Sequence, residues 1–243
     1  MSGRTLSTLY PAPYPRRDAR HSAAGRGRGH TGAVGVRRWW DERALPRLTH
    51  RSCQGADVDR WRAPVCRAAT GVVLDVGFGS GPNLEHYPSA VTRVLVAEPS
   101  DLAWELSGPR RTAFERPVER TTLDAADLSA LADGSVDTVV TAWSLCTVPE
   151  VDRALAEALR VLRPGGSLRF VEHSLAPDAG AAGWQRRVQP VWGRVAGGCH
   201  VDRDLPATIG AAGFVVELEQ ARYIAPGPFR AWGWFVSGTA RPR

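Results

Sequence analysis

The chain has 243 residues, 43% of them hydrophobic, which is typical of a soluble protein with one large domain. Its net charge of +6 is unevenly placed, because residues 1–38 hold eight Arg and one acid whereas the remainder holds 23 Arg and 24 acids. A nearly neutral main domain argues against a nucleic-acid surface. Four scattered cysteines without a C-x-x-C pair indicate reduced cytoplasmic thiols rather than a disulfide framework or a zinc site. No apolar run is long enough to predict a membrane span.

The first two segments differ in composition. Residues 1–35 are rich in Pro, Gly and Arg and lack hydrophobic periodicity, which predicts a disordered tail. Its Arg-Gly stretch is compatible with RNA binding, although a solvated tail is the more frequent interpretation. Apolar residues recur at helical spacing over 36–69, which predicts a helical cap of two helices divided near Pro46 to Gly55.

A glycine loop follows the first predicted core strand. Val72 to Val76 is a short β-branched run, typical of a strand buried on both faces. Gly77, Gly79 and Gly81 then force a tight turn in which side chains would block the approach of a ligand to the backbone. Asn83 is expected to open a helix. Strand, loop and helix together predict a nucleotide-binding cradle.

The spacing of these glycines excludes two common nucleotide motifs. A dinucleotide fingerprint, G-x-G-x-x-G, would need its third glycine where Pro82 or Leu84 stands. No Lys-Ser/Thr pair follows the loop, so a P-loop is excluded as well. The pattern is D-x-G-x-G-S-G, beginning at Asp75.

An acid ends the second predicted strand, Thr92 to Ala97. Glu98, followed by Pro99, lies 21 residues after Gly77. In doubly wound nucleotide folds a carboxylate at this distance accepts hydrogen bonds from both ribose hydroxyls.

The downstream elements continue to alternate between strand and helix. Strands are expected over 112–118, 137–143 and 167–172, and an amphipathic helix over 149–162. Two further strands, over 214–224 and 231–239, are expected to be antiparallel. This order predicts a parallel sheet with helices on both faces. Because ligands bind beyond the carboxyl ends of such strands, Trp143 is expected to border the reaction site.

Several motifs together resemble the class I S-adenosylmethionine-dependent methyltransferases of type 11. The loop at 75–81 is similar to their first motif, and R-V-L-R-P-G-G at 160–166 is similar to their helix-stop segment. Further features resemble the methyltransferase-like family that includes thiol S-methyltransferases: Leu145–Val148, Glu172–His173, Trp184–Gln185, Gly198–Cys199 and Arg203. The resemblance implies an α/β fold: a Rossmann-like, doubly wound, mostly parallel seven-stranded sheet with an antiparallel final strand, over 70–243.

The resemblance also implies S-adenosylmethionine as cofactor. The residues expected to bind it are Asp75, Gly77, Gly79, Gly81, Asn83, Glu98, Pro99, Asp124, Ala125, Asp127 and Trp143. Asp124 with Ala125 is the first choice for the adenine edge and Asp127 the second, while solvated acids at a helix cap are an equally frequent alternative.

The expected acceptor is a small or lipid-like molecule, such as a thiol. A thiol needs only partial deprotonation, whereas an amine or oxygen would benefit from a general base. His173, at the tip of the fifth strand, is the candidate base, with a purely structural role as the alternative. No metal is expected, because no His, Cys or Asp cluster has metal-ligand spacing. The other functions considered are a nicotinamide-dependent oxidoreductase and a non-catalytic cofactor- or RNA-binding protein.

Overall fold

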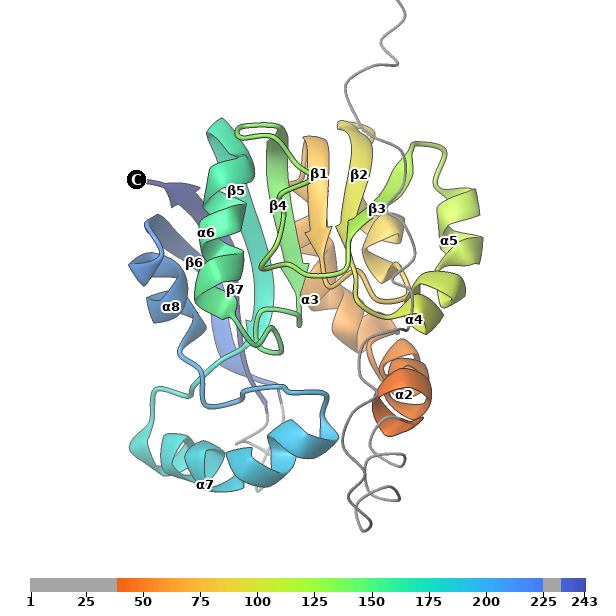
Figure 1. Ribbon diagram of the computed structural model, residues 1–243. Helices are drawn as coiled ribbons and strands as arrows, with labels where there is room; N and C mark the ends of the chain where they lie inside the picture. Colours follow the sequence, from red (N-terminus) through yellow and green to blue (C-terminus); the bar gives the residue numbers. More distant parts are fainter. Residues whose placement is uncertain (1–38, 225–232) are drawn as a thin grey trace, which may run out of the picture.

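The computed structural model describes residues 39–224 and 233–243. The predicted tail over 1–35, the start of the helical cap and residues 231–232 of the last predicted strand lie outside the described residues. Within them the chain forms one seven-stranded sheet flanked by helices (Figure 1). None of the described helices is both long and apolar enough to cross a membrane.

The sheet has the order β3-β2-β1-β4-β5-β7-β6. Its strands are β1 (Gly71–Val76), β2 (Val91–Ala97), β3 (Val118–Thr122), β4 (Val136–Ala142), β5 (Leu162–His173), β6 (Phe214–Tyr223) and β7 (Trp234–Pro242). β7 pairs antiparallel with both β5 and β6, and the other pairs are parallel. The predicted doubly wound, mostly parallel sheet with an antiparallel final strand is confirmed. The strand order reverses between β1 and β4, so the ligand crevice of this topology lies at their carboxyl ends.

Each face of the sheet is covered by its own helices. The helical elements are η1 (Trp40–Ala44), α2 (Leu45–Ser52), α3 (Ala56–Arg67), η2 (Pro82–His86), α4 (Asp101–Leu106), α5 (Gly108–Ala113), α6 (Val151–Val161), α7 (Ala179–Val195) and α8 (Leu205–Ala211). Leu74 of β1 packs in a core with residues of α6 and α8, and its neighbour Val73 packs in a second core with residues of α3. This alternation follows from the two-residue period of a strand.

The carboxyl ends of the parallel strands lie together at one edge of the sheet. In Figure 1 the arrowheads of the parallel strands, such as β1 and β4, point toward α7 and α2, which lie beyond that edge. Trp40 Nε1 donates to Val195 O, so the amino-terminal helices contact the end of α7. The edge of the sheet predicted to bind the ligand therefore lies on the side of α2 and α7.

Two local predictions differ from the structure. The third strand, predicted over 112–118, lies at Val118–Thr122, and Gly108–Ala113 is helical with Pro109 in its first turn. After the glycine loop the chain forms only a short 3₁₀ turn, Pro82–His86, instead of a longer helix. The break between the first helices falls at residues 53–55, inside the predicted division from Pro46 to Gly55. Pro46 itself sits in the first turn of α2, where proline is tolerated.

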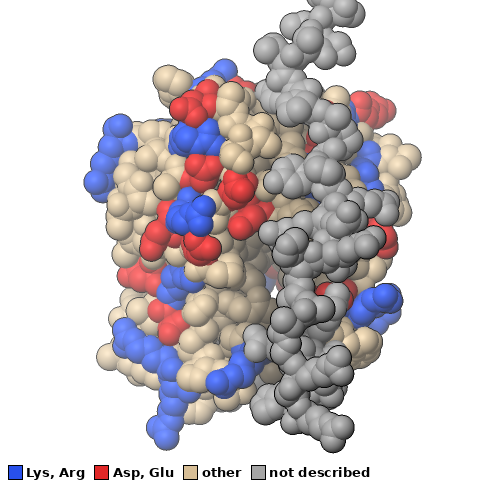
Figure 2. All heavy atoms as spheres, viewed as in Figure 1, with Lys and Arg blue, Asp and Glu red and all other residues tan. Residues whose placement is uncertain are grey.

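Charged side chains of both signs alternate on the molecular surface over α6 (Figure 2). Arg160 pairs with Asp133 and Glu157, and Arg153 pairs with Glu150. Such interspersed ion pairs agree with the near-neutral charge of the sequence after residue 38.

Candidate active site

The glycine loop has the backbone geometry of a ligand cradle. Gly77, Gly79 and Gly81 all have positive φ, at 71°, 58° and 76°. A Cβ on Gly77 would lie 2.3 Å from Ser144 Cβ, so a side chain there would push the β4 end away from the loop. A Cβ on Gly79 would come no closer than 4.0 Å to a neighbouring atom, Gly77 O. Only Gly79 therefore faces open space, where a ligand can approach the backbone.

Glu98 lies beside this loop. It is 5% exposed, and its Oε2 accepts a hydrogen bond from Gly79 N and its Oε1 one from Ser100 N, both at 2.7 Å. Burial raises the pKa of its carboxyl, against the effect of these two N–H groups. A carboxylate has about four acceptor sites, so two remain for the hydroxyls of a ribose. Pro99, the next residue, is exposed.

Asp75 and Asn83 lie in a polar network beneath the loop. Asn83 Nδ2 donates to both oxygens of Asp75 at 3.0 Å, and Tyr87 Oη donates to Oδ2 at 2.7 Å. Arg62, which sequence reasoning missed, donates to Asn83 Oδ1. Burial raises the pKa of Asp75 to about 6, although the hydrogen bonds from Tyr87 and Asn83 oppose this. These polar groups bind one another, so here they position the loop, and their direct contact with a cofactor stays a prediction.

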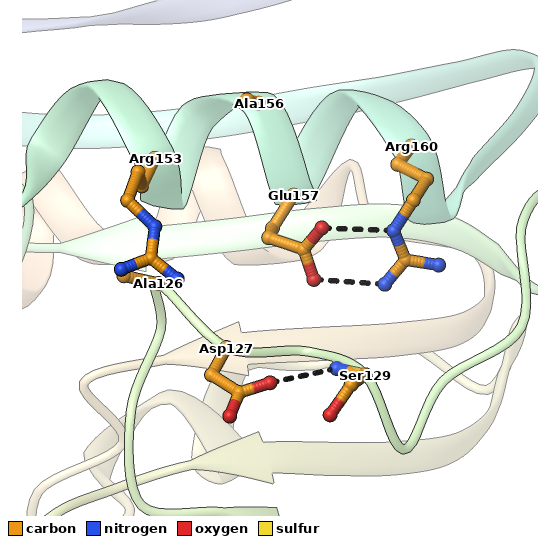
Figure 3. Close-up of a pocket in the computed structure, with 7 residues that line it drawn as sticks. All are labelled: Ala126, Asp127, Ser129, Arg153, Ala156, Glu157 and Arg160. Carbon is orange, nitrogen blue, oxygen red and sulfur yellow. Dashed lines mark hydrogen bonds and ion pairs between the residues drawn. The ribbon is translucent and has the colours of Figure 1, made fainter.

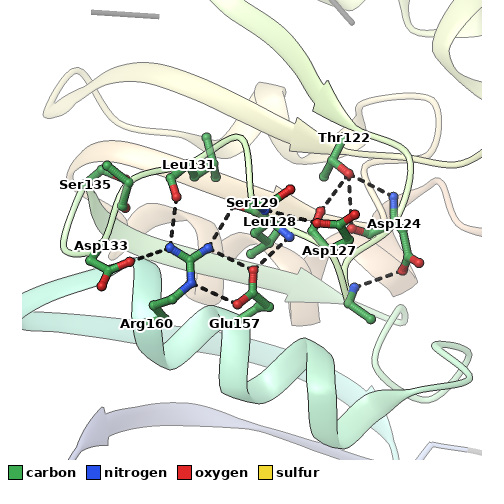
Figure 4. A network of polar contacts seen from close by, with 12 residues as sticks. Thr122, Asp124, Asp127, Leu128, Ser129, Leu131, Asp133, Ser135, Glu157 and Arg160 are labelled. Atoms are coloured by element: carbon green, nitrogen blue, oxygen red, sulfur yellow. Dashed lines mark hydrogen bonds and ion pairs between the residues drawn. The ribbon is translucent and has the colours of Figure 1, made fainter.

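The acids expected at the adenine edge lie on the turn after β3. Thr122 Oγ1 donates to the carbonyl oxygens of Asp124 and Asp127 and accepts from Asp124 N, so it organises this turn (Figure 4). Glu98 N donates to Thr122 O, which brings the turn next to Glu98, the residue predicted to bind the ribose. Ala125 is half-buried beside Asp124.

Asp127 lines a cavity that is separate from the glycine loop. It is exposed and lines a cavity of about 340 Å³, opposite Arg153, Glu157 and Arg160 of α6 (Figure 3). Its Oδ1 accepts from Ser129 N, and hydrogen bonds with the side chain and then the backbone of Ser129 lower the pKa of its carboxyl. Thr122 contacts the backbone of both Asp124 and Asp127, so the choice between Asp124 with Ala125 and Asp127 for the adenine edge stays a prediction. A second cavity, of about 620 Å³, lies between α2, η2 and α5.

Trp143 follows β4 in a strained conformation. It is the one non-glycine residue with positive φ, 55°, in the part of the chain that the structure describes. Its indole Nε1 is buried and has no hydrogen-bond partner among the described residues. Strain and an unpaired buried donor of this kind gather at ligand sites. Gly79, the free acceptor sites of Glu98 and this indole together fit a nucleoside-like cofactor.

The loop after Trp143 is held by a buried carboxylate, Glu172, which sequence reasoning named only as part of a family motif and gave no role. Glu172 is fully buried; its Oε1 accepts from Ser144 N and Leu145 N, and its Oε2 accepts from Cys146 N. Ser144 Oγ donates to Val76 O, which ties this loop to the glycine loop. The sequence signal that could have identified this role is an acid inside the apolar run of β5, because a buried carboxylate requires several hydrogen-bond donors.

The same loop meets the segment after α7. Arg203 donates to Leu145 O and Val148 O, and His200 N donates to Cys146 O at 2.8 Å. Gly197 and Gly198 both have positive φ, and a Cβ on Gly197 would lie 2.5 Å from Leu45 Cδ2. Position 197 therefore requires glycine. The turn places Cys199 next to Cys146.

His173 lies next to the thiols of Cys146 and Cys199. Its Nδ1 is 3.9 Å from Cys146 Sγ and 3.8 Å from Cys199 Sγ, and the two sulfurs are 3.8 Å apart. The hydrogen bond with Cys146, and next the contact with His173, lower the pKa of Cys199 to about 4. The same hydrogen bond and burial raise the pKa of Cys146. All four cysteines are free thiols. Linear spacing does not predict this group, because its members are 26 to 53 positions apart.

Aromatic rings pack against and near the imidazole of His173. Phe235 contacts the rings of His173 at 4.6 Å, and those of Trp61 and Trp143 at 5.6 Å each, between centroids. The Arg62 guanidinium lies 5.1 Å from the Trp143 ring. This group, which we call the Phe235 cluster (Trp61, Trp143, His173 and Phe235), combines two buried aromatic rings with the half-buried indole of Trp143 and imidazole of His173.

The family model described as "Methyltransferase domain" matches residues 74–170. Human thiol S-methyltransferase TMT1B is 33% identical over 174 residues, which cover 69% of this chain and 69% of the human protein. The rat protein of the same name is 33% identical over 165 residues, 65% of this chain and 64% of its own. A demethylmenaquinone methyltransferase from Renibacterium salmoninarum is 39% identical over 123 residues, 47% of this chain and 48% of the relative. The chain thus spans about two thirds of the length of the thiol S-methyltransferases that it matches.

Solved structures share the fold. The [4+2]-cyclase SpnF superposes with a TM-score of 0.58 at 21% identity, covering 76% of this chain and 80% of the cyclase. The trans-methyltransferase CalH, solved with SAH, superposes with a TM-score of 0.53 at 18% identity, covering 88% of this chain and 61% of CalH. At such identities these structures show the fold alone. The cradle and the sequence matches together show that this chain belongs to the class I S-adenosylmethionine-dependent methyltransferases, and resembles the family of the thiol S-methyltransferases.

Proposed function

We propose that this protein transfers the methyl group of S-adenosylmethionine to the sulfur of a small, apolar thiol. The observation that carries the methyl transfer is the open side of Gly79 beside Glu98 and the unpaired indole of Trp143. The thiol acceptor is supported by the similarity to the thiol S-methyltransferases over about two thirds of the chain.

The residues of the chain serve mainly to align the reactants. When bound, S-adenosylmethionine supplies a methyl group on a positively charged sulfur, so transfer to R–SH yields R–S–CH₃, S-adenosylhomocysteine and one proton. Gly77, Gly79 and Gly81 would hold its amino-acid end, and Glu98 its ribose. The Glu172 carboxylate fixes the loop from Trp143 to Cys146, and with it the position of the acceptor relative to the cradle.

The Phe235 cluster supports an apolar acceptor. Trp143 and His173 are half-buried and pack against the buried ring of Phe235, next to the loop that contacts the cradle. Aromatic side chains of this kind bind small or lipid-like molecules and exclude water. For an amine or oxygen acceptor, His173 would serve as general base; a thiol makes a weaker demand, since partial deprotonation is enough.

The test is methyl transfer by the full chain to a matched series of acceptors. The series pairs an alkanethiol with the alkanol and the alkylamine of equal chain length, and adds a demethylated naphthoquinol because of the demethylmenaquinone methyltransferase relatives. We expect a methyl thioether from the thiol alone, with a KM that falls as the alkyl chain lengthens. Methylation of quinol carbon, or of the alkanol or amine with no thioether, would refute the thiol assignment.

A further inference from the structure

Three metal-ligating atoms converge beside the proposed acceptor site. Cys146 Sγ, Cys199 Sγ and His173 Nδ1 form a nearly equilateral triangle, with edges of 3.8, 3.8 and 3.9 Å. They come from three separate segments: the loop after β4, the tip of β5 and the turn after α7. No fourth His, Cys, Asp or Glu joins them among the residues that the structure describes.

The triangle has the dimensions of a tetrahedral zinc site. With Zn–S bonds of about 2.3 Å and a Zn–N bond of about 2.05 Å, tetrahedral angles place two sulfurs about 3.8 Å apart and each sulfur about 3.6 Å from the nitrogen. The observed edges match the first distance and exceed the second by two to three tenths of an ångström. Two thiolates and an imidazole are also the donors that select zinc over magnesium or calcium.

The backbone around the two cysteines is held from several sides. Cys146 N donates to Glu172, and Cys146 O accepts from His200 N. Gln189 Nε2 donates to Cys199 O. Such outer contacts orient ligands in known metal sites. Cys146 and Cys199 are 1% and 6% exposed, whereas His173 is only half-buried, so the group is accessible from the imidazole side.

We propose that Cys146, Cys199 and His173 bind a zinc ion through Sγ, Sγ and Nδ1 and leave its fourth position for the sulfur of the acceptor. The second part of this proposal rests on the proposed function. Zinc sites with three protein ligands keep their fourth position for water or substrate, and Cys₂His is one such ligand set. The half-buried members of the Phe235 cluster, Trp143 and His173, would then contact the apolar part of the acceptor.

The cation would replace a general base for the thiol. On binding, the acceptor loses its S–H proton to solvent, and the sulfur keeps the electron pair that bonds to the metal. That sulfur then forms the new S–C bond, and the electron pair of the broken C–S bond remains on the departing sulfur. No oxidant or reductant is needed, and His173 holds the cation instead of accepting a proton.

Metal content provides the first test and requires no activity. The full chain, purified under reducing conditions without chelator, should contain one equivalent of zinc by elemental analysis. Co²⁺ in its place should give intense thiolate-to-cobalt absorption. Cys199→Ser and His173→Gln should each lose at least tenfold in zinc affinity. Cys53→Ser, a half-buried thiol outside the triangle, is the matched control and should bind as the wild type does. Reduced wild-type protein that binds no zinc, or variants that bind as tightly as the wild type, would overturn the site.

The second test concerns the open position. An alkanethiol added to the cobalt-loaded chain should shift and intensify the thiolate absorption, and the alkanol of equal length should leave it unchanged. Thiol methylation that survives complete metal removal would overturn this role while leaving the proposed function intact. Zinc bound at the triangle without any thiol methylation would refute the proposed function and leave the metal site standing.

Discussion

Gly79 is the residue at which the cradle can be tested without disturbing the core. Gly79→Ala should lower the affinity for S-adenosylhomocysteine at least tenfold, because its Cβ would project into the open space on the ligand side of the loop. The positive φ of 58° should cost about 1–2 kcal/mol of stability as well. Calorimetric titration measures the first effect and urea unfolding the second.

Gly165 offers the matched control for this substitution. It also has positive φ, 80°, and a Cβ there would meet nothing within 4 Å, but it lies near the start of β5, at the opposite end of that strand from His173. Gly165→Ala should therefore cost a similar free energy of unfolding and leave binding unchanged. Equal affinities in the two variants would mean that Gly79 does not face the cofactor.

Asp75 should make stability depend on pH in an unusual direction for an acid. Burial raises its pKa from 3.8 to about 6, so the folded state holds this proton more tightly than the unfolded state does. The stabilisation is complete below about pH 4 and is lost as pH rises through 6, to a total of about 3 kcal/mol. In urea unfolding, the free energy of the wild type should thus fall between pH 4 and 7 relative to Asp75→Asn. A difference between the two proteins that stays constant with pH would contradict this assignment.

At the scale of elements, Glu172 connects β5 to the loop after β4. Glu172→Gln replaces an acceptor of three N–H bonds by an amide whose NH₂ would face one of those donors, so it should cost about 2–4 kcal/mol of stability and slow methyl transfer. Glu217→Gln, in an exposed ion pair with Arg241, should cost less than about 1 kcal/mol. Urea unfolding compares the two. A loss no larger in Glu172→Gln than in Glu217→Gln would show that the loop does not depend on this carboxylate.

The elements that could be predicted are those whose signal is local. The strand at 72–76 and its glycine loop were evident because β-branched runs and glycine spacing are short-range patterns. β3 was misplaced because it is a half-buried edge strand, Val-Glu-Arg-Thr-Thr, with little apolar signal. The upstream Thr112 and Phe114, which favour strands, lie at the end of α5. Tertiary contacts outweighed local propensity there.

At the scale of the whole molecule, the site depends on contacts that linear order hides. Cys146 and Cys199 are 53 positions apart and meet only because the glycine turn after α7 returns to the loop after β4. Arg62 reaches Asn83 from α3, 21 positions earlier in the chain. The cofactor loop can be predicted from the sequence because a single segment forms it. The acceptor side of the site cannot be predicted in this way, because it is formed by three segments that are far apart in the chain.

Cofactor selectivity is a property of the complete fold and is the broadest test of the assignment. S-adenosylhomocysteine at 100 times its Kd should stabilise the chain by about 2.7 kcal/mol, a rise in Tm of roughly 5–10 °C for a protein of this size. NADH should produce no shift, because Pro82 and Leu84 stand where its fingerprint needs a third glycine. Thermal unfolding with each ligand, followed by circular dichroism, makes the comparison. A shift with NADH and none with S-adenosylhomocysteine would refute the cofactor assignment and favour the oxidoreductase considered from the sequence.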